Sequence, residues 1–495
     1  MVAVAVVAVV AAGALVGPLA RAASAATSEP PSVVLVVTDD QRAGTLDAMP
    51  TVRAELAGRG VDFPEAFVTN PLCCPSRASI LTGQYSHSTG VYRQVPPFGR
   101  FEWFRDDDTI ATRLDDAGYE TALFGKYLDG YQHAALSGYV PPGWDRWEAF
   151  VRSAYVDYRL THDGTIVDHG DTDADYATDV LAADAASFVR GAAGPLFLVF
   201  APPAPHAPAM PAPRHVNAPV PAARLMPPSF DEADVSDKPG YVRSLPRLDE
   251  EARAELERLR VDQTRSLLSV DEGVAEILTA LEETGRLENT LMIYTSDNGL
   301  LLGEHRWTAK EVPYEEAIRV PFVVRYDPVT RGRPGSVLAP VLNIDIAPTI
   351  AEVTGAVPAP VDGRSILPLL QGNDRGWRDA FLIEHLRGTN PVPTYCAIRS
   401  PDHLYVEYET GERELYDLER DPFQLRNLAG TSASATTAEE LGARLADLCE
   451  PPPPGLHGSA LAPDAWMTGV LVVLVAGGVV VERRRRRRSH GAQGS

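Results

Sequence analysis

Residues 33–41 read V-V-L-V-V-T-D-D-Q, an apolar run that ends in two consecutive carboxylates. Its β-branched residues follow one another without a polar interruption, which is typical of a strand buried on both faces of a parallel sheet. Open α/β sheets bind their ligands at the carboxyl ends of such strands. We therefore expect Asp39 and Asp40 to lie in a metal site; the alternative is a turn or a helix cap, which needs only one Asp.

Similar strand signals alternate with helical ones along the chain. Apolar runs predict strands at 120–124, 196–200, 291–295 and 322–325. Helical signals lie at 49–60, at 109–118 with Thr109 as its cap, at 176–188 and at 267–285. The alternation predicts a doubly wound α/β domain, which we place at residues 31–375. Shorter strands and one helix follow, and they predict a small antiparallel α+β subdomain at 376–449.

The net charge restricts the kinds of partner. The chain has 495 residues, with 45 Lys and Arg against 67 Asp and Glu, which gives a net charge of −22. Six of the arginines form one run at 483–488, so the rest of the chain is more acidic still. A nucleic-acid backbone needs a basic surface, and we therefore expect no nucleic-acid partner. A pocket for an anion would need positive charge gathered locally.

The N-terminal end of the chain predicts an export signal. Residues 1–25 combine an uncharged Ala/Val run with small-x-small sites at 20–22 and 23–25, and we interpret them as a signal peptide. They lack a positive n-region, and an uncleaved anchor is the alternative. An exported protein also permits a disulfide between Cys396 and Cys449, which both lie in the last folded region.

The C-terminal end predicts a membrane anchor. We expect a Pro-rich stalk at 450–465, a transmembrane segment at 466–482 and a basic cytoplasmic tail at 483–495. The uncharged stretch is short for a span, but the arginines after it favour the cytoplasmic side. A cell-wall sorting signal is the alternative, although no LPxTG-like site precedes the stretch. We therefore expect the body on the extracellular face of the cell membrane, or secreted if the tail is removed.

Residues 71–83 read P-L-C-C-P-S-R-A-S-I-L-T-G and have the character of an active-site signature rather than of core. Cys73, Pro75, Ser76 and Arg77 carry this interpretation. Cys73 and Cys74 are adjacent and do not suit a disulfide with each other, so the stretch offers two candidate nucleophiles.

Two further residues are candidates for binding an anion or moving a proton. Lys126 follows the predicted strand 120–124, which fixes its stem near Asp39; a solvated surface lysine is the alternative. His206 stands between prolines at the start of the Pro-rich stretch 201–230, which stiffens the chain around the imidazole. A merely exposed loop histidine is the alternative there.

A second strand end repeats the pattern of the first. The run 291–295 leads into Ser296, Asp297 and Asn298. Together with Asp39 and Asp40, the last two form an all-oxygen ligand set. Such a set selects a hard cation such as Ca²⁺ or Mg²⁺ and disfavours zinc.

These pieces together resemble the sulfatase family. The family's C-x-P-S-R motif, followed by L-T-G, is matched by residues 73–77 and 81–83. Its other motifs follow in the same order over most of residues 31–430, at 39–40, 125–126, 205–208, 297–299, Lys310, 318–321 and 414–428. Within the family, the N-acetylglucosamine-6-sulfatase-like branch is the most similar, through Cys73-Cys74, Gly125-Lys126-Tyr127-Leu128 and Tyr395-Cys396.

The resemblance implies a fold and a reaction. The fold is alkaline-phosphatase-like, with a doubly wound mixed sheet sandwiched by helices. A formylglycine-generating enzyme converts Cys73 to Cα-formylglycine, and Cys74 is left as the free position of the motif. One hydroxyl of the hydrated aldehyde attacks sulfur, and the other then expels sulfate. The implied substrate is a sulfated carbohydrate such as N-acetylglucosamine 6-sulfate, or an aryl sulfate.

The resemblance also implies two groups of ligands. The metal ligands are Asp39, Asp40, Asp297, Asn298 and residue 73, around a Ca²⁺ or Mg²⁺ ion that lowers the pKa of the attacking hydroxyl.

The sulfate group is implied to be held by Arg77, Lys126 and Lys310. His206 or Lys310 is implied to protonate the leaving oxygen, so both also belong to the substrate-binding set.

One position departs from many members of the family. Many arylsulfatases carry a histidine two residues after the lysine of their G-K motif, where this chain has Leu128. His305 and His133 are candidates to replace it, and the sequence does not decide between them. Two other functions remain open, a phosphonate monoester hydrolase or phosphodiesterase of the same superfamily and a non-enzymatic binding module. The intact set of candidate residues argues against the binding module.

Overall fold

The computed structural model describes residues 29–220, 226–357 and 359–456. A ten-stranded sheet forms its centre, in the order β11-β2-β10-β9-β1-β8-β4-β5-β6-β7. The strands are β1 (Ser32–Thr38), β2 (Val61–Asp62), β4 (Glu120–Gly125), β5 (Arg146–Arg152), β6 (Arg159–His162), β7 (Thr165–Asp168), β8 (Leu196–Ala201), β9 (Thr290–Ser296), β10 (Phe322–Arg325) and β11 (Gly335–Ser336). The five strands expected from apolar runs, β1 among them, are all present.

Five neighbouring strands of this sheet, β9, β1, β8, β4 and β5, run parallel. Outside them, β10 runs antiparallel to β9 and β6 antiparallel to β5, so the sheet is mixed as expected. The pairing of β1 with β9 places Thr38 opposite Ser296. The polar residues that follow these two strands therefore leave the sheet side by side.

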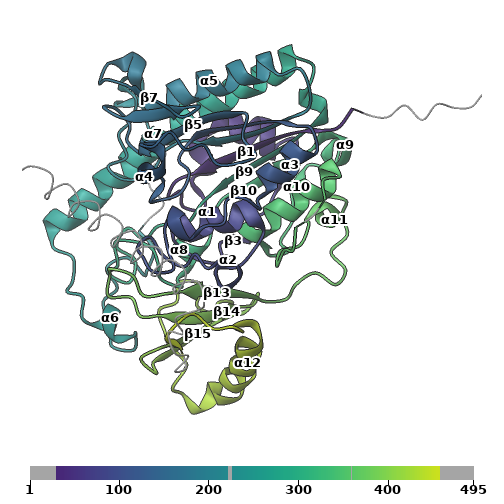
Figure 1. Cartoon of the computed structure of the whole chain (residues 1–495). Coiled ribbons are helices and arrows are strands. Elements are labelled where there is room, and N and C mark those ends of the chain that lie inside the picture. The colour runs from purple at the N-terminus through teal and green to yellow at the C-terminus, as the bar shows by residue number, and fades with distance from the viewer. Residues whose placement is uncertain (1–28, 221–225, 358, 457–495) are drawn as a thin grey trace, which may run out of the picture.

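Helices cover both faces of the sheet (Figure 1). Successive residues of a strand point to opposite faces. Val33, Leu35 and Val37 pack with α1, α3 and α10 on one face, whereas Val34 and Val36 pack with α5 and α7 on the other. These helices span Cys73–Thr82 (α1), Ile110–Asp116 (α3), Ala177–Gly191 (α5), Glu250–Glu283 (α7) and Ile346–Thr354 (α10). Both faces of β1 are buried, as its continuous apolar run predicts.

The expected helices show how far local sequence signals reach. The Thr109 side chain caps α3 by accepting a hydrogen bond from the Thr112 N–H at 3.4 Å, which confirms the predicted cap. α7 is 34 residues long and begins well before the predicted start. Its first turns are charged and largely exposed, so no apolar spacing reveals them. The helix expected at 49–60 is reduced to the short π-helix η2 (Val52–Ala57).

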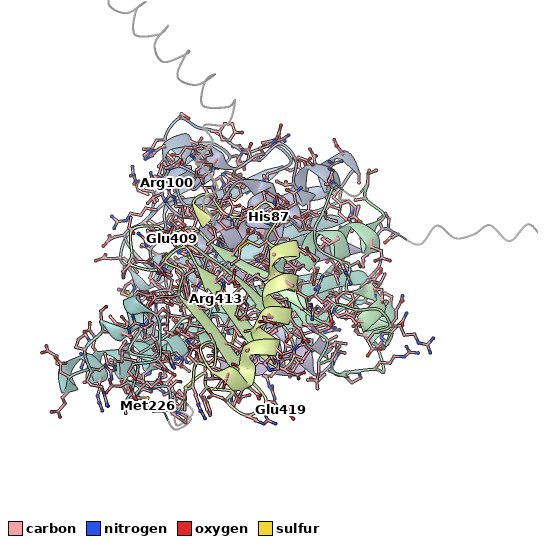
Figure 2. All side chains as sticks on the ribbon, turned by 90° about the horizontal axis from the view of Figure 1, so that it is seen from below. His87, Arg100, Met226, Glu409, Arg413 and Glu419 are labelled. Carbon is pink, nitrogen blue, oxygen red and sulfur yellow. A yellow bond between two sulfur atoms is a disulfide. The ribbon has the colours of Figure 1, made fainter. Side chains whose placement is uncertain are left out.

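The C-terminal subdomain is an antiparallel sheet in the order β13-β14-β15-β16. Figure 2, seen from below, shows one helix beside this sheet. Its elements are β13 (Phe381–His385), β14 (Tyr395–Arg399), β15 (His403–Tyr408), β16 (Arg413–Asp417) and α12 (Ala435–Leu448). α12 packs on the sheet through Leu441, which joins an apolar cluster with Leu382 and Tyr405. A disulfide links Cys396 on β14 to Cys449 just after α12. The expected subdomain and cysteine pairing are confirmed.

Shorter elements connect these layers. β3 (Ala66–Phe67) and β12 (Val341–Leu342) form a separate two-stranded sheet. The short α-helices are α2 (Ser86–Thr89), α4 (Tyr131–Ala135), α6 (Gly240–Arg243), α8 (Glu315–Ile318), α9 (Asp327–Thr330) and α11 (Leu367–Leu370). The 3-10 turns are η1 (Thr45–Ala48), η3 (Phe101–Trp103), η4 (Asp173–Asp175), η5 (Pro213–His215), η6 (Leu287–Asn289), η7 (Asn343–Asp345) and η8 (Ser432–Ser434). Within the described part of the Pro-rich stretch 201–230, η5 is the only helix or strand after the end of β8 at Ala201.

The targeting segments expected at the two ends, 1–25, 466–482 and 483–495, lie outside the described residues. Among the residues that are described, no helix is both long and apolar enough to cross a bilayer. The expected stalk, 450–465, is described as far as Leu456, which is fully buried in the same apolar cluster as α12. The first residues of that stretch therefore belong to the packed subdomain.

Candidate active site

Two strand ends build the floor of the site. Asp39 and Asp40 follow β1, Asp297 and Asn298 follow β9, and all four are buried. The Asp40 N–H donates to Asp297 Oδ1 over 3.1 Å, and Asn298 Nδ2 donates to Asp40 Oδ1 over 2.7 Å. Asp40 has a φ of 64°, a left-handed conformation that Asp adopts more readily than most residues. The two strand ends are thus joined directly by hydrogen bonds.

Cys73 is the first residue of α1 and faces these carboxylates. Its Sγ lies 3.4 Å from Asp39 Oδ1 and 3.8 Å from Asp40 Oδ1. The sequence interpretation treated 71–83 as a signature and missed this helix. Gly83, which ends α1 with a φ of 74°, was the available signal, because glycine commonly closes helices in that conformation.

Three cationic side chains reach the same point from different elements. The Arg77 guanidinium on α1 donates from Nε to Asp297 Oδ2 over 2.8 Å, and its second terminal nitrogen is buried without a hydrogen-bond partner among the described residues. Lys126, just after β4, places its Nζ 2.6 Å from Asp39 Oδ2. Lys310 Nζ contacts Asp40 Oδ1 and lies 2.7 Å from Cys73 Sγ. The local positive charge that an acidic chain needs for an anion site is present here.

Burial and opposite charges act against each other on the pKa values of these groups. Burial alone would raise the pKa of Asp39, but the Lys126 ammonium and its neighbours hold it well below its usual range. Burial would lower the pKa values of Lys126 and Lys310, yet both are raised, by Asp39 and by Asp40 respectively. Burial raises the pKa of the Cys73 thiol well above its usual value. Because only a thiolate is a good nucleophile, the unmodified Cys73 is poorly suited to attack.

The donor set at this point fits a hard divalent cation. Asp39, Asp40, Cys73 and Asp297 offer ligand atoms that all lie within 4.8 Å of one another. Asn298 Oδ1 is buried and accepts no hydrogen bond within the described part of the chain, which leaves an acceptor available for a metal. Carboxylate and amide oxygens are the ligands that Ca²⁺ and Mg²⁺ prefer. This cluster can hold a metal ion.

His206 lies at the open side of the cluster. Its Nε2 is 3.6 Å from Asp40 Oδ2, and its Nδ1 is 2.7 Å from the carbonyl oxygen of Ala207. The imidazole side chain is 42% exposed, whereas Asp40 is buried. The Pro-rich stretch therefore presents this histidine between the buried cluster and solvent.

Comparison with protein families identifies the arrangement. The sulfatase family model matches residues 31–356, a range that contains every site residue described above. The chain belongs to the sulfatase family. A second model, described as the C-terminal region of N-sulphoglucosamine sulphohydrolase, matches residues 303–450. The family recognised from residues 73–77 and 81–83 is confirmed.

Individual relatives resemble this sulfatase over different shares of their own length. It is 35% identical over 382 residues to the extracellular sulfatase SULF-1 homologue of Drosophila melanogaster, and the match covers 74% of this chain. That match spans only 34% of the fly protein, so the fly protein is much longer. The N-acetylglucosamine-6-sulfatase of Capra hircus is 32% identical over 465 residues, which cover 83% of this chain and 82% of the goat protein.

Two solved structures illustrate the fold. One protein in complex with its substrate, D-glucosamine-2-N,6-O-disulfate, matches the sulfatase with a TM-score of 0.74 and 25% identity, over 85% of this chain and 98% of that one. The phosphonate monoester hydrolase of Agrobacterium radiobacter matches with a TM-score of 0.63 and 22% identity, over 85% and 96%. The second likeness shows the fold alone. The expected alkaline-phosphatase-like fold is confirmed.

Many arylsulfatases have a histidine where this chain has Leu128. Neither of the two candidates to replace it, His305 and His133, contacts the cluster. Leu128 itself is buried in the apolar core. His305 is fully buried, with its Nδ1 2.6 Å from Glu232 Oε2 and its ring stacked on Tyr314. His133 lies on the exposed side of α4. In the part of the chain that the structure describes, neither makes a hydrogen bond to residues 39, 40 or 73.

Several supporting contacts of the sulfatase site were not visible in the sequence. The Gln41 N–H donates to Ser296 Oγ over 2.9 Å and so reinforces the junction of β1 and β9. Ser76, whose role the motif leaves open, is fully buried and its Oγ accepts from Asn343 Nδ2 over 2.9 Å. Its contact fixes α1 against η7. Asn343 lies 267 residues along the chain, so no local pattern could have indicated it.

Proposed function

We propose that this sulfatase hydrolyses sulfate monoesters of a carbohydrate, with N-acetylglucosamine 6-sulfate as the type of substrate and aryl sulfates as smaller alternatives. The observation that carries the proposal is the position of Cys73. Its Sγ lies 2.7 Å from Lys310 Nζ and 3.4 Å from Asp39 Oδ1, where anion-binding and metal-binding groups meet. A nucleophile at residue 73 would thus face both the groups that bind the anionic ester and the groups that bind the metal ion.

We infer that a formylglycine-generating enzyme converts Cys73 before the protein is active. The raised pKa of the buried thiol supports this step, because the unmodified side chain is a poor nucleophile. The modified residue supplies a hydroxyl on a hydrated aldehyde as the nucleophile. Cys74 is buried with its Sγ 4.0 Å from the carbonyl oxygen of Asp129, and it keeps a structural place behind the site.

Three cationic side chains are proposed to hold the sulfate group: those of Arg77, Lys126 and Lys310. Arg77 is fixed by Asp297 and retains an unpartnered terminal nitrogen, which suits a charge-assisted hydrogen bond to a sulfate oxygen. The Lys126 and Lys310 ammonium groups are each fixed by a carboxylate, so little reorganisation is needed when the substrate binds.

A divalent cation would be held by Asp39, Asp40, Asp297 and Asn298, and we propose Ca²⁺, with Mg²⁺ as the alternative. When bound, such an ion lowers the pKa of a nearby hydroxyl and polarises an oxygen of the substrate. His206, the most exposed member of the site, is placed to protonate the leaving alcohol oxygen, and Lys310 is the alternative proton donor.

The sugar substrate and the place of action are inferred from relatives. The goat relative is named an N-acetylglucosamine-6-sulfatase, and the solved neighbour binds a glucosamine sulfated at nitrogen and at O6. The fly relative is named an extracellular sulfatase, which supports export of this one. The membrane anchor at 466–482 remains a prediction from the sequence.

The test compares esters on protein made with a formylglycine-generating enzyme. We expect turnover of 4-nitrophenyl sulfate and of N-acetylglucosamine 6-sulfate, and mass spectrometry of the peptide 60–77 should show the thiol of Cys73 replaced by an aldehyde. The solved phosphonate monoester hydrolase shares the fold, so phosphate and phosphonate esters are measured beside the sulfates. Faster cleavage of a phosphorus ester, or full activity with an unmodified cysteine, would overturn the proposal.

A further inference from the structure

A pocket of about 240 Å³ opens beside Lys126, outside the cluster described above. Two segments line it, residues 126–129 with Gln132 and residues 150–153. These segments follow or end β4 and β5, which run parallel with Gly125 opposite Ala149. The pocket therefore lies at the same carboxyl edge of the sheet as Cys73, next to a lysine proposed to hold the sulfate group.

The side chain of Arg152 carries an unpaired charge at this pocket. It is exposed, and it makes no hydrogen bond or ion pair within the described residues. Arg159, on the next strand, lies directly opposite Arg152, is also exposed and is likewise without an ion pair there. Like charges directly opposite each other destabilise a pair of strands. In a chain of net charge −22, two neighbouring arginines without carboxylate partners indicate a binding role.

The backbone is irregular at the same place. Phe150 pairs with Leu160 and Arg152 pairs with Arg159, so β5 has one extra residue, Val151, at a β-bulge. Bulges are frequent beside active sites, where they change the direction of a side chain. Here Phe150 and Val151 remain buried while Arg152 is exposed. The bulge thus presents Arg152 at the rim while the apolar residues before it stay in the core.

The remaining polar groups of the pocket suit a sugar. The carboxylate of Asp129 is held by Gln94 Nε2 at 2.9 Å, and the Gln132 side chain is held by the Gly130 N–H, which donates to its Oε1 over 3.0 Å. Ser153 adds an exposed hydroxyl. A carboxylate acceptor, an amide and a hydroxyl can bind sugar hydroxyls, whereas the guanidinium groups require an anion.

We propose that this pocket receives the alcohol part of the substrate and that Arg152, assisted by Arg159, binds a second anionic group on that glycan, a sulfate or a carboxylate. The inference rests on the proposed function, and it narrows the preferred substrates to glycans that carry a second negative group besides the sulfate that is cleaved. Arg152 is then a specificity-determining residue that acts on binding, while the residues around Cys73 act on every sulfate ester.

The experiment compares a substrate with one anionic group and substrates with two. Steady-state kinetics are measured with 4-nitrophenyl sulfate, D-glucosamine-2-N,6-O-disulfate and a 6-sulfated glucosamine joined to a uronic acid. Arg152→Gln is expected to lower kcat/KM for a doubly anionic substrate by about tenfold to a hundredfold, the effect of losing one charged hydrogen bond. The loss should appear in KM, and turnover of 4-nitrophenyl sulfate should stay within about twofold of the unsubstituted enzyme.

Three variants complete the comparison. Arg152→Lys should recover part of the loss, because the charge remains without the two-pronged geometry of the guanidinium. Arg159→Gln should give a smaller loss of the same kind. Arg413→Gln, on the exposed part of β16 seen in Figure 2, is the matched control and should change nothing. The relative loss with the sulfated and the uronate-bearing substrate shows which second anion Arg152 binds.

The outcomes separate the subsite from the reaction. If the unsubstituted enzyme cleaves sulfates but Arg152→Gln affects all substrates equally, or none of them, the subsite is wrong and the proposed function stands. If the unsubstituted enzyme, carrying formylglycine, cleaves no sulfate ester, the proposed function fails and this inference fails with it.

Discussion

The cluster around Cys73 and the pocket beside Lys126 lie at the same carboxyl edge of the sheet, but their charges are arranged in opposite ways. Around Cys73, each cation contacts a buried carboxylate: Lys126 contacts Asp39 and Lys310 contacts Asp40. In the pocket beside Lys126, by contrast, the Arg152 guanidinium is exposed and without a carboxylate partner among the described residues. Paired buried charges are fixed in place before substrate arrives, which favours chemistry. An exposed unpaired charge is free to select among substrates, which favours recognition.

The largest effect is expected at the centre of the buried part. Cys73→Ala should reduce kcat for every sulfate ester by about 10³-fold to 10⁶-fold, as for loss of a nucleophile. Cys74→Ala is the matched control, because its side chain is equally buried but faces the carbonyl of Asp129. Initial rates with 4-nitrophenyl sulfate provide the measurement. An active Cys73→Ala variant, or an inactive but folded Cys74→Ala variant, would contradict the assignment.

Lys126→Met should be the next most damaging of the substitutions. It removes one partner of a buried pair and leaves the Asp39 carboxylate without its direct ion-pair partner. Loss of one such partner at a binding site costs about 2–5 kcal/mol, which corresponds to roughly thirtyfold to a few thousandfold in kcat/KM. Because Lys126 is proposed to hold the sulfate common to all substrates, the loss should be similar for 4-nitrophenyl sulfate and for a disulfated sugar. A loss confined to the sugar would place Lys126 in the pocket instead.

Removal of the cation should affect activity and stability together. With a chelator, activity should fall to background and the melting temperature should drop, because Asp39, Asp40 and Asp297 are then buried beside one another without the ion's charge. A ligand at a hundred times its Kd stabilises a protein by about 2.7 kcal/mol, so the shift is measurable by calorimetry. Adding back Ca²⁺ or Mg²⁺ separately identifies the ion. An unchanged melting temperature and full activity would argue against a metal in the site.

The sequence indicated the buried part far better than the pocket. Asp39-Asp40 and Asp297-Asn298 follow apolar runs, and parallel neighbouring strands bring such ends together. The Cys73 motif is local and was visible as well. The contacts between them were not, since the Arg77 guanidinium meets Asp297 across 220 residues of chain.

The pocket depends on features that no local pattern reveals. β6 and β7 are the last two strands at one side of the sheet and have four residues each, too short for a clear alternation. The opposition of Arg152 and Arg159 results from a register shift, which is a property of the paired strands and not of either one alone. Outside the pocket, the start of α7 was missed for a different reason, because its exposed first turns carry no apolar spacing. Recognition surfaces are thus harder to predict than buried strand ends, because they rely on tertiary register.

A buried carboxyl on β5, close to the pocket, offers a pH test of intermediate size. Glu148 is fully buried, and burial, followed by the nearby Asp184, raises its pKa to about 8 from 4.5, although Arg146 opposes the shift. Between these two pKa values, Glu148 therefore keeps its proton in the folded state but has lost it in the unfolded state. Its contribution to stability is complete below pH 4.5 and is lost as the pH rises towards 8, by at most about 1.4 kcal/mol per pH unit.

Glu148→Gln should accordingly flatten the pH dependence of unfolding between pH 5 and 8, about the interval between the two pKa values. Urea denaturation at several pH values measures it. Glu120→Gln is a suitable control on β4, since Glu120 is partly exposed at the opposite end of the strands. An unchanged slope in Glu148→Gln would show that this carboxyl is ionised in the folded protein.

The smallest effect is expected from salt, and it distinguishes the two parts without any substitution. Raising the ionic strength from 0.1 M to 1 M shortens the screening length from about 10 Å to about 3 Å, which weakens exposed charges much more than buried ones. KM for a doubly anionic sugar should therefore rise several-fold, while KM for 4-nitrophenyl sulfate, held by the buried cations, should change less. In Arg152→Gln the two substrates should respond alike, because the exposed charge is gone. If KM for both substrates already responds alike in the unsubstituted enzyme, the exposed charge of Arg152 does not contribute to substrate binding in the proposed way.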